Sequence, residues 1–137
     1  MSASPQYTDR PISAVAVLSA ANTARDGATG TYVTAYTFTA ASAGGKGGRI
    51  DALSIVATAT TTAGVVRVFV NAALVREFLV TAVAPSTTVR TWTIPTTDGA
   101  DANGRLPLGI VCAPGDVVKF STHNAEAFQC RVEGGEF

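Results

Sequence analysis

VVRVFVNAALVREFLV, residues 65–80, gives the clearest local pairing in the sequence, because it holds two strand-forming runs separated by a short link. Residues 65–70 and 74–80 are rich in β-branched and aromatic residues, which are favoured in strands. Asn71 opens the link, and asparagine tolerates the positive φ that a tight turn requires. The stretch therefore predicts a β-hairpin.

Runs with a period of two residues continue on both sides of this hairpin. In residues 49–60 both alternating sets of side chains are apolar, which is typical of a central strand. The other expected strands span residues 32–39, 87–94, 106–112, 117–122 and 127–132. Short loops of turn residues join the last three of these strands and predict a meander.

The N-terminal region is less regular. We divide the chain into residues 1–25, an arm or first strand, and residues 26–137, a β-sandwich domain. Residues 1–11 show no periodicity, which predicts an extended N-terminal arm. Residues 15–25 are rich in alanine, and they fit one or two helical turns about as well as a strand.

About eight short strands with turn residues between them predict an all-β fold, an antiparallel β-sandwich. A jelly roll is the expected form for eight strands, and an immunoglobulin-like sandwich is the alternative. The chain of 137 residues is long enough for one core. We expect the strand aromatics to pack in that core: Trp92, Phe69, Phe78, Phe120 and Phe128.

Composition and charge argue against two classes of binding partner, nucleic acids and membranes. Hydrophobic residues make up 47% of the chain and charged residues 15%, which argues against disorder. The formal net charge is zero and the arginines are spread along the chain, so we expect no nucleic-acid partner. No apolar run approaches the length of about 18 residues that crosses a bilayer, so we expect no membrane partner.

Residues suited to catalysis or cofactor binding are sparse. His123 is the only histidine and lies in a turn, and Ser121 lies on a strand and outside any GxSxG motif. Cys112 and Cys130, with one histidine, do not supply a zinc ligand set, and as small apolar residues they are expected to be buried and reduced. We therefore expect no enzymatic activity and no cofactor. The loop 98–104 contains oxygen ligands and glycines, and a calcium site there is an alternative to a plain loop.

Several segments carry a resemblance to a known family. These segments are GGRIDAL at 47–53, TTTAGVVRVF at 60–69, LPL at 106–108, STHNAEAF at 121–128 and GGEF at 134–137. In these segments the chain resembles the small β-sandwich decoration, or cement, proteins of tailed-bacteriophage capsids. Such a protein is made in the cytoplasm of the bacterial host and resides on the capsid surface of the virion.

This resemblance implies a structural role. The expected partner is the major capsid protein, and the expected assembly is a homo-oligomer, a trimer, that stabilises the shell. The expected interface residues are Tyr7, Arg10 and Ile12 in the arm, and Phe137 at the C-terminal end. Two alternatives stay open: a component of the phage tail, neck or baseplate, and a carbohydrate-binding β-sandwich module.

Overall fold

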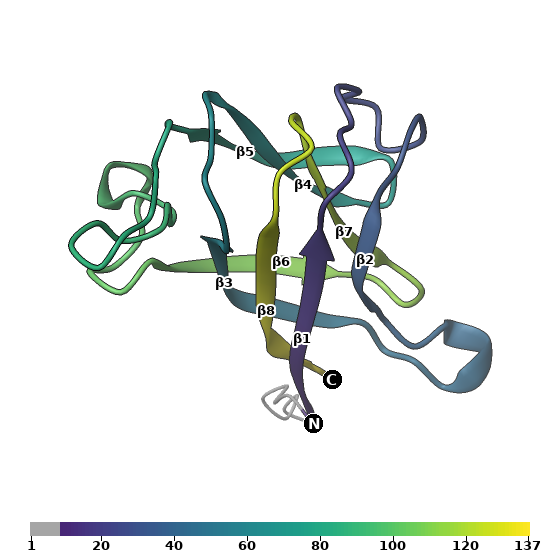
Figure 1. Ribbon diagram of the computed structural model, residues 1–137. Coiled ribbons are helices and arrows are strands. Elements are labelled where there is room, and N and C mark those ends of the chain that lie inside the picture. The colour runs from purple at the N-terminus through teal and green to yellow at the C-terminus, as the bar shows by residue number, and fades with distance from the viewer. Residues whose placement is uncertain (1–8) are drawn as a thin grey trace.

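The computed structural model describes residues 9–137 and shows an all-β sandwich of eight strands in two antiparallel sheets (Figure 1). The predicted fold class is therefore confirmed. The strands are β1 (Arg10–Leu18), β2 (Val33–Thr37), β3 (Gly48–Ala57), β4 (Gly64–Val70), β5 (Ala73–Val80), β6 (Arg105–Cys112), β7 (Val117–Thr122) and β8 (Phe128–Glu136). Two short 3-10 helices, η1 (Ala41–Ala43) and η2 (Thr96–Asp98), lie in the connections.

The strand order identifies the sandwich as a jelly roll. One sheet has the order β1-β8-β3-β6 and the other β2-β7-β4-β5. Successive strands cross between the sheets, except for the hairpin of β4 and β5, in which Asn71 has the expected positive φ of 55°. The predicted meander is wrong, because β6 and β8 belong to one sheet and β7 to the other.

Two segments differ from their predicted structure. Residues 10–18 form β1, a full strand, so residues 10 and 11 of the predicted arm belong to a strand, and the rest of that prediction up to residue 8 lies outside the described part of the chain. The predicted strand at 87–94 is wrong, since that segment makes only an isolated bridge from Thr93 to Val56. Two of its side chains still enter the core: Ile94 is buried, and Trp92 packs edge-to-face on Phe128 with ring centroids 6.1 Å apart.

The core lies between the sheets, where Phe120, Val68 and Ile55 are almost completely buried. β4 is buried on both faces, because the connection between β1 and β2 covers its outer side. Tyr32 of that connection packs edge-to-face on Phe69 at a centroid distance of 5.1 Å. The five aromatic residues predicted to lie in the core are all buried, although Phe69 faces this covering segment. No helix in residues 9–137 has the length and apolar character to span a membrane.

Candidate functional site

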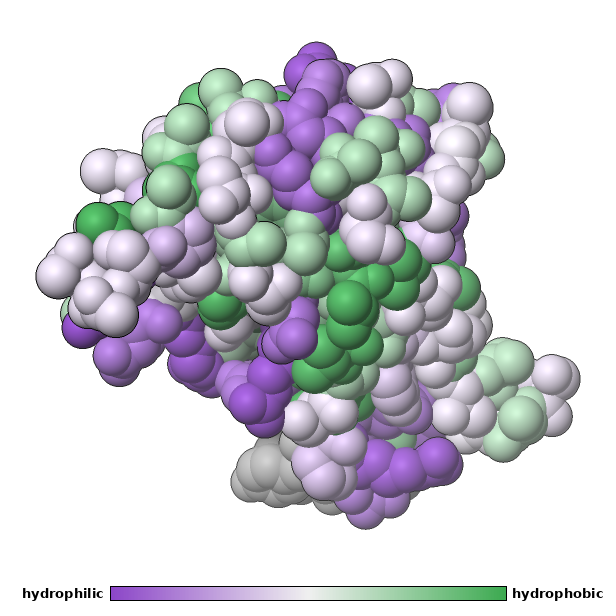
Figure 2. All heavy atoms as spheres, viewed as in Figure 1, coloured by the Kyte–Doolittle hydropathy of each residue, from purple (hydrophilic) through white to green (hydrophobic). Residues whose placement is uncertain are grey.

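The outer face of the β1-β8-β3-β6 sheet exposes apolar side chains in a regular pattern. β1 alternates strictly, so Ile12, Ala16 and Leu18 enter the core, whereas two valines point outward. The exposed fractions are 53% for Val15 and 60% for Val17. Figure 2 shows hydrophobic surface over β1 next to hydrophilic surface. We call Val15 and Val17 the β1 valine pair.

Cross-strand register places polar side chains beside this pair. Val15 pairs with Arg131 of β8, and Val17 pairs with Gln129. On the other side of β8, Arg131 pairs with Ser54 of β3 and Gln129 pairs with Val56. Directly paired residues of an antiparallel sheet point to the same face. The face therefore carries rows that mix valine, arginine, amide and hydroxyl groups.

An ionic network crosses the same face. Arg105 of β6 donates from Nε to Glu133 of β8 at 2.8 Å, and Nη2 of Arg131 lies 3.5 Å from the other oxygen of Glu133. Nη2 of Arg131 also donates to the Ser13 hydroxyl at 2.9 Å. The hydrogen bond from Arg105 holds the pKa of the Glu133 carboxyl below its ordinary value. Two guanidinium groups thus share one carboxylate.

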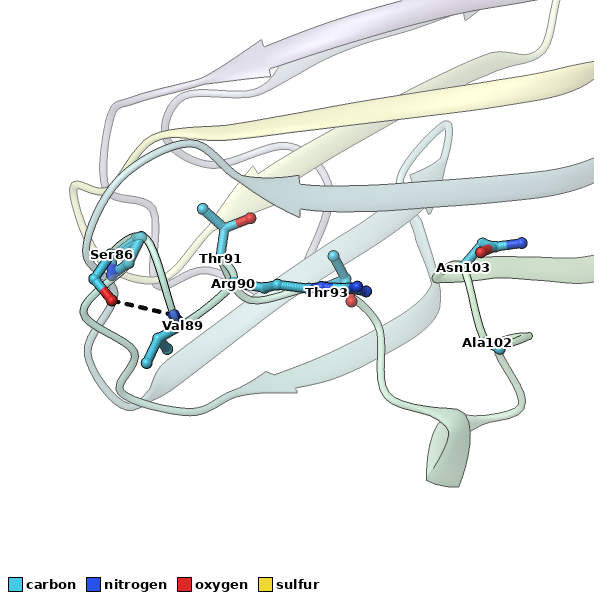
Figure 3. A pocket seen from close by; sticks show the side chains of 8 residues that line it. Ser86, Val89, Arg90, Thr91, Thr93, Ala102 and Asn103 are labelled. Atoms are coloured by element: carbon cyan, nitrogen blue, oxygen red, sulfur yellow. Dashed lines mark hydrogen bonds between the residues drawn. The ribbon is translucent and has the colours of Figure 1, made fainter.

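Two open hollows adjoin each other, one over this face and one along the connection between β5 and β6. The first, of about 490 Å³, is lined by Val15, Ser54, Val56, Asn103, Gln129 and Arg131. The second, of about 430 Å³, lies between the 85–93 segment and the 102–103 turn, and Figure 3 shows Arg90, Thr91 and Thr93 along it. Asn103 lines both hollows, and Thr93 bridges to Val56 on the floor of the first. We call the two together the sheet groove.

A second polar cluster lies on the other sheet, under the connection between β1 and β2. Arg67 of β4 is 1% exposed, and its Nε donates to Glu77 of β5 at 2.9 Å. Its Nη1 donates to the carbonyl of Asn22 at 3.1 Å, and its Nη2 lies 3.4 Å from Nδ1 of His123. Arg25 approaches Glu77 from the solvent side at 3.2 Å. Because a buried guanidinium needs partners on all its edges, this cluster holds the connection against the sheet.

His123 and Ser121, the two residues considered for nucleophilic chemistry, share no hydrogen bond in the described residues. His123 faces the Arg67 guanidinium, whereas the buried Ser121 hydroxyl has no hydrogen-bond partner in the described residues. In the 98–104 loop Asp98 and Asp101 are both exposed, and the Asp101 carboxylate accepts the backbone N–H groups of Asn103 and Arg105 at 2.8 and 3.0 Å. Residues 9–137 contain no group of three or more potential metal-ligating His, Cys, Asp or Glu side chains.

The two cysteines are free, buried and far apart. Cys112 pairs with Gly48 at one end of β3, whereas Cys130 pairs with Ile55, seven positions further along. Seven residues of a strand span roughly 23 Å, which no disulfide bridges. Burial raises the pKa of the Cys112 thiol to about 11, and burial also raises the pKa of Cys130. Both are therefore core residues, as their apolar neighbours in the sequence indicated.

The four residues expected at an interface fall in different environments. Arg10 is exposed at the start of β1, whereas Ile12 is 4% exposed and belongs to the core. Phe137 is half-buried, and its N–H donates to the carbonyl of Gly47 at 3.0 Å. Tyr7 lies outside the described residues.

The residues that sequence reasoning missed are the outward members of β1 and β8. For the β1 valine pair a signal was present, because RPISAVAVL at 10–18 alternates in a strict period of two. For Arg131 and Gln129 the alternation of β8 indicated exposure, but only cross-strand register shows which residues lie beside them. The aromatic residues of 9–137 are buried except Tyr32, Tyr36 and Phe137, which are partly exposed.

Comparison with family models, with curated proteins and with solved structures finds no match. The surface chemistry of the sandwich is therefore the main guide to function.

Proposed function

We propose that this chain is a virion structural protein that binds the outer surface of a bacteriophage capsid and stabilises the shell. Its partner is the major capsid protein, and it assembles as a homo-oligomer, a trimer. The proposal starts from the sequence resemblance to capsid decoration proteins. Its physical support is the β1 valine pair, two apolar side chains held in exposed positions on a regular strand.

The β1 valine pair suits a protein partner because it combines apolar area with polar surroundings. Fully burying a valine side chain contributes about 1.5 kcal/mol, so completing the burial of two half-exposed valines contributes on the order of 1.5 kcal/mol for the pair. The neighbouring guanidinium and amide groups of Arg131 and Gln129 provide the polar rim found around protein interfaces. The formal net charge of zero keeps long-range repulsion between copies small.

Purified particles test the location. We expect the chain to be present in many copies per particle, in a constant ratio to the major capsid protein, and to appear on the outer shell in particle images. A chain that is absent from purified particles, or restricted to the tail, neck or baseplate, contradicts the proposal.

A binding assay on particles that lack the chain tests the surface. We expect Val15→Asp and Val17→Asp together to weaken binding at least about tenfold, which corresponds to 1.4 kcal/mol. Leu79→Asp is the matched control, because Leu79 is 70% exposed but lies on β5 of the other sheet. Equal binding by both variants, with unchanged thermal unfolding, would show that the β1 valine pair is not the contact.

A further inference from the structure

The sheet groove carries positive charge without a carboxylate in its lining. Arg90 and Arg131 are its only charged members. Arg90 is exposed and forms no ion pair with any residue from 9 to 137. Arg131 shares the single carboxylate of Glu133 with Arg105, so that pairing leaves one positive charge in excess. Charge complementarity therefore favours an anionic occupant.

Two side-chain amides along the groove are free to bind a backbone. Asn103 and Gln129 are exposed, and their side-chain amides make no hydrogen bond within the described part of the chain. Ser54 and Val56 point to the same side of β3, and Gln129 and Arg131 to the same side of β8. Along each of these strands, every second side chain therefore points into the groove. An extended polypeptide has the same two-residue repeat, so its backbone groups can face these donors and acceptors.

Apolar members of the groove favour a protein over a nucleic acid. Val15 and Val56 line one hollow and Val89 the other, and the three are exposed. They offer contacts to aliphatic side chains. A single-stranded nucleic acid would instead need aromatic side chains for base stacking, and the lining of the groove contains none.

We propose that the sheet groove binds an extended, acidic segment of the partner protein. Carboxylates of the segment pair with Arg90 and Arg131, since a guanidinium binds a carboxylate through two parallel hydrogen bonds. Its backbone bonds to the amides of Asn103 and Gln129, and its apolar side chains contact the valines. This inference rests on the proposed function, because it names the chemistry of the partner on the same face of the sheet.

Peptide titration of the full chain tests the groove. The probe is a ten-residue peptide in which glutamate alternates with valine and serine, and the control peptide has lysine in place of glutamate. We expect the acidic peptide to bind, to weaken as salt rises from 50 to 500 mM (roughly 14 to 4 Å of screening length) and to outcompete the lysine peptide at least about fivefold. Amide chemical-shift changes should gather at residues 54–56, 90–93, 103 and 129–131.

Variants test whether acidic-peptide binding depends on the arginines of the groove or on any exposed arginine. Arg90→Gln and Arg131→Gln should each weaken acidic-peptide binding at least about threefold. Arg76→Gln is the matched control and should leave acidic-peptide binding unchanged, because Arg76 is an exposed arginine of β5 in the other sheet. Equal loss in all three variants, no loss in the groove variants, or tighter binding of an oligonucleotide than of the acidic peptide would each overturn the inference.

The two proposals fail separately. If the chain occupies capsids but the acidic peptide does not bind the groove, the proposed function stands and this inference falls. If the peptide binds as expected but the chain is absent from particles, the capsid role falls and the acidic-peptide site remains.

Discussion

Glu136 ties the end of the last strand to the start of the connection after β2. This residue is 3% exposed, and its carboxylate accepts the Tyr36 hydroxyl at 2.5 Å and the backbone N–H and hydroxyl of Thr39 at 2.8 and 3.1 Å. The hydrogen bond from Tyr36 is the main reason why the pKa of Glu136 lies below its ordinary value of 4.5. Burial, followed by the same hydrogen bond, raises the pKa of Tyr36 to about 12. Tyr36 thus stabilises the ionised form of Glu136, and Glu136 stabilises the protonated form of Tyr36.

Glu136→Gln should lower the free energy of unfolding by about 2 kcal/mol at pH 7, because it removes the charge from buried hydrogen bonds. A lowered pKa contributes stability that is present above 4.5 and is lost as the pH falls through the folded value. The difference between the natural chain and the variant should therefore shrink below pH 4.5. Urea unfolding between pH 3 and 7 measures this difference in the free energy of unfolding.

Asp98→Asn is the control for this pH dependence, since Asp98 is an exposed carboxylate in η2. It should change stability little across the range. A Glu136→Gln deficit that stays constant from pH 7 to pH 3 would be inconsistent with an ionised, hydrogen-bonded Glu136.

At the scale of elements, β8 is held closely against its neighbour β3 where the register shifts. The shift lies between Ile50 and Ala52 of β3, opposite Gly134 of β8. A Cβ atom on Gly134 would lie 2.0 Å from the carbonyl oxygen of Arg49. Because that atom belongs to the backbone, it can move away only if the two strands separate.

Gly134→Ala should therefore lower the free energy of unfolding by roughly 2 kcal/mol or more. Gly109→Ala is the matched control, since Gly109 lies in β6 of the same sheet and a Cβ there meets no atom within 4 Å. Thermal or urea unfolding of the two variants gives the comparison. Similar stability of both would mean that β3 and β8 are less tightly apposed than the structure shows.

The first and last strands of the sandwich, β1 and β8, lie together on one face of the molecule. β1 and β8 pair over nine residues, so the first and last strands lie side by side (Figure 1). β3 joins β8 on its other side, and the sheet groove draws on β1, β3, β8 and the connection between β5 and β6. Assembly of the proposed binding surface therefore depends on complete folding of the jelly roll.

One core shared by both sheets predicts a single unfolding transition. Trp92, from the connection between β5 and β6, packs on Phe128 of β8 and reports on that core. Its fluorescence and the far-ultraviolet circular dichroism should change at the same urea concentration. Two separated transitions would show that the sheets, or the long connection, unfold independently.

Local alternation of side chains is enough to predict most of the strands. The β4–β5 hairpin, the central position of β3 and the strands β6 and β7 follow from residue type and period, because strand side chains alternate between a buried and an exposed face. The same alternation led to the wrong prediction of a strand at residues 87–94. Trp92 and Ile94 are buried as the pattern implies, but they enter the core from a connection that lacks a strand partner along its length, and Val89 is exposed.

Short-range pattern and hydrophobicity are enough to predict the all-β class, the count of about eight strands and the burial of the five strand aromatics. Which strands pair depends on long-range contacts, and these place Val15 beside Arg131 and bury Arg67 against Glu77. Residues more than a hundred positions apart meet in β1 and β8. Such neighbours are set by the pairing of strands that lie far apart in the sequence, which no local pattern encodes.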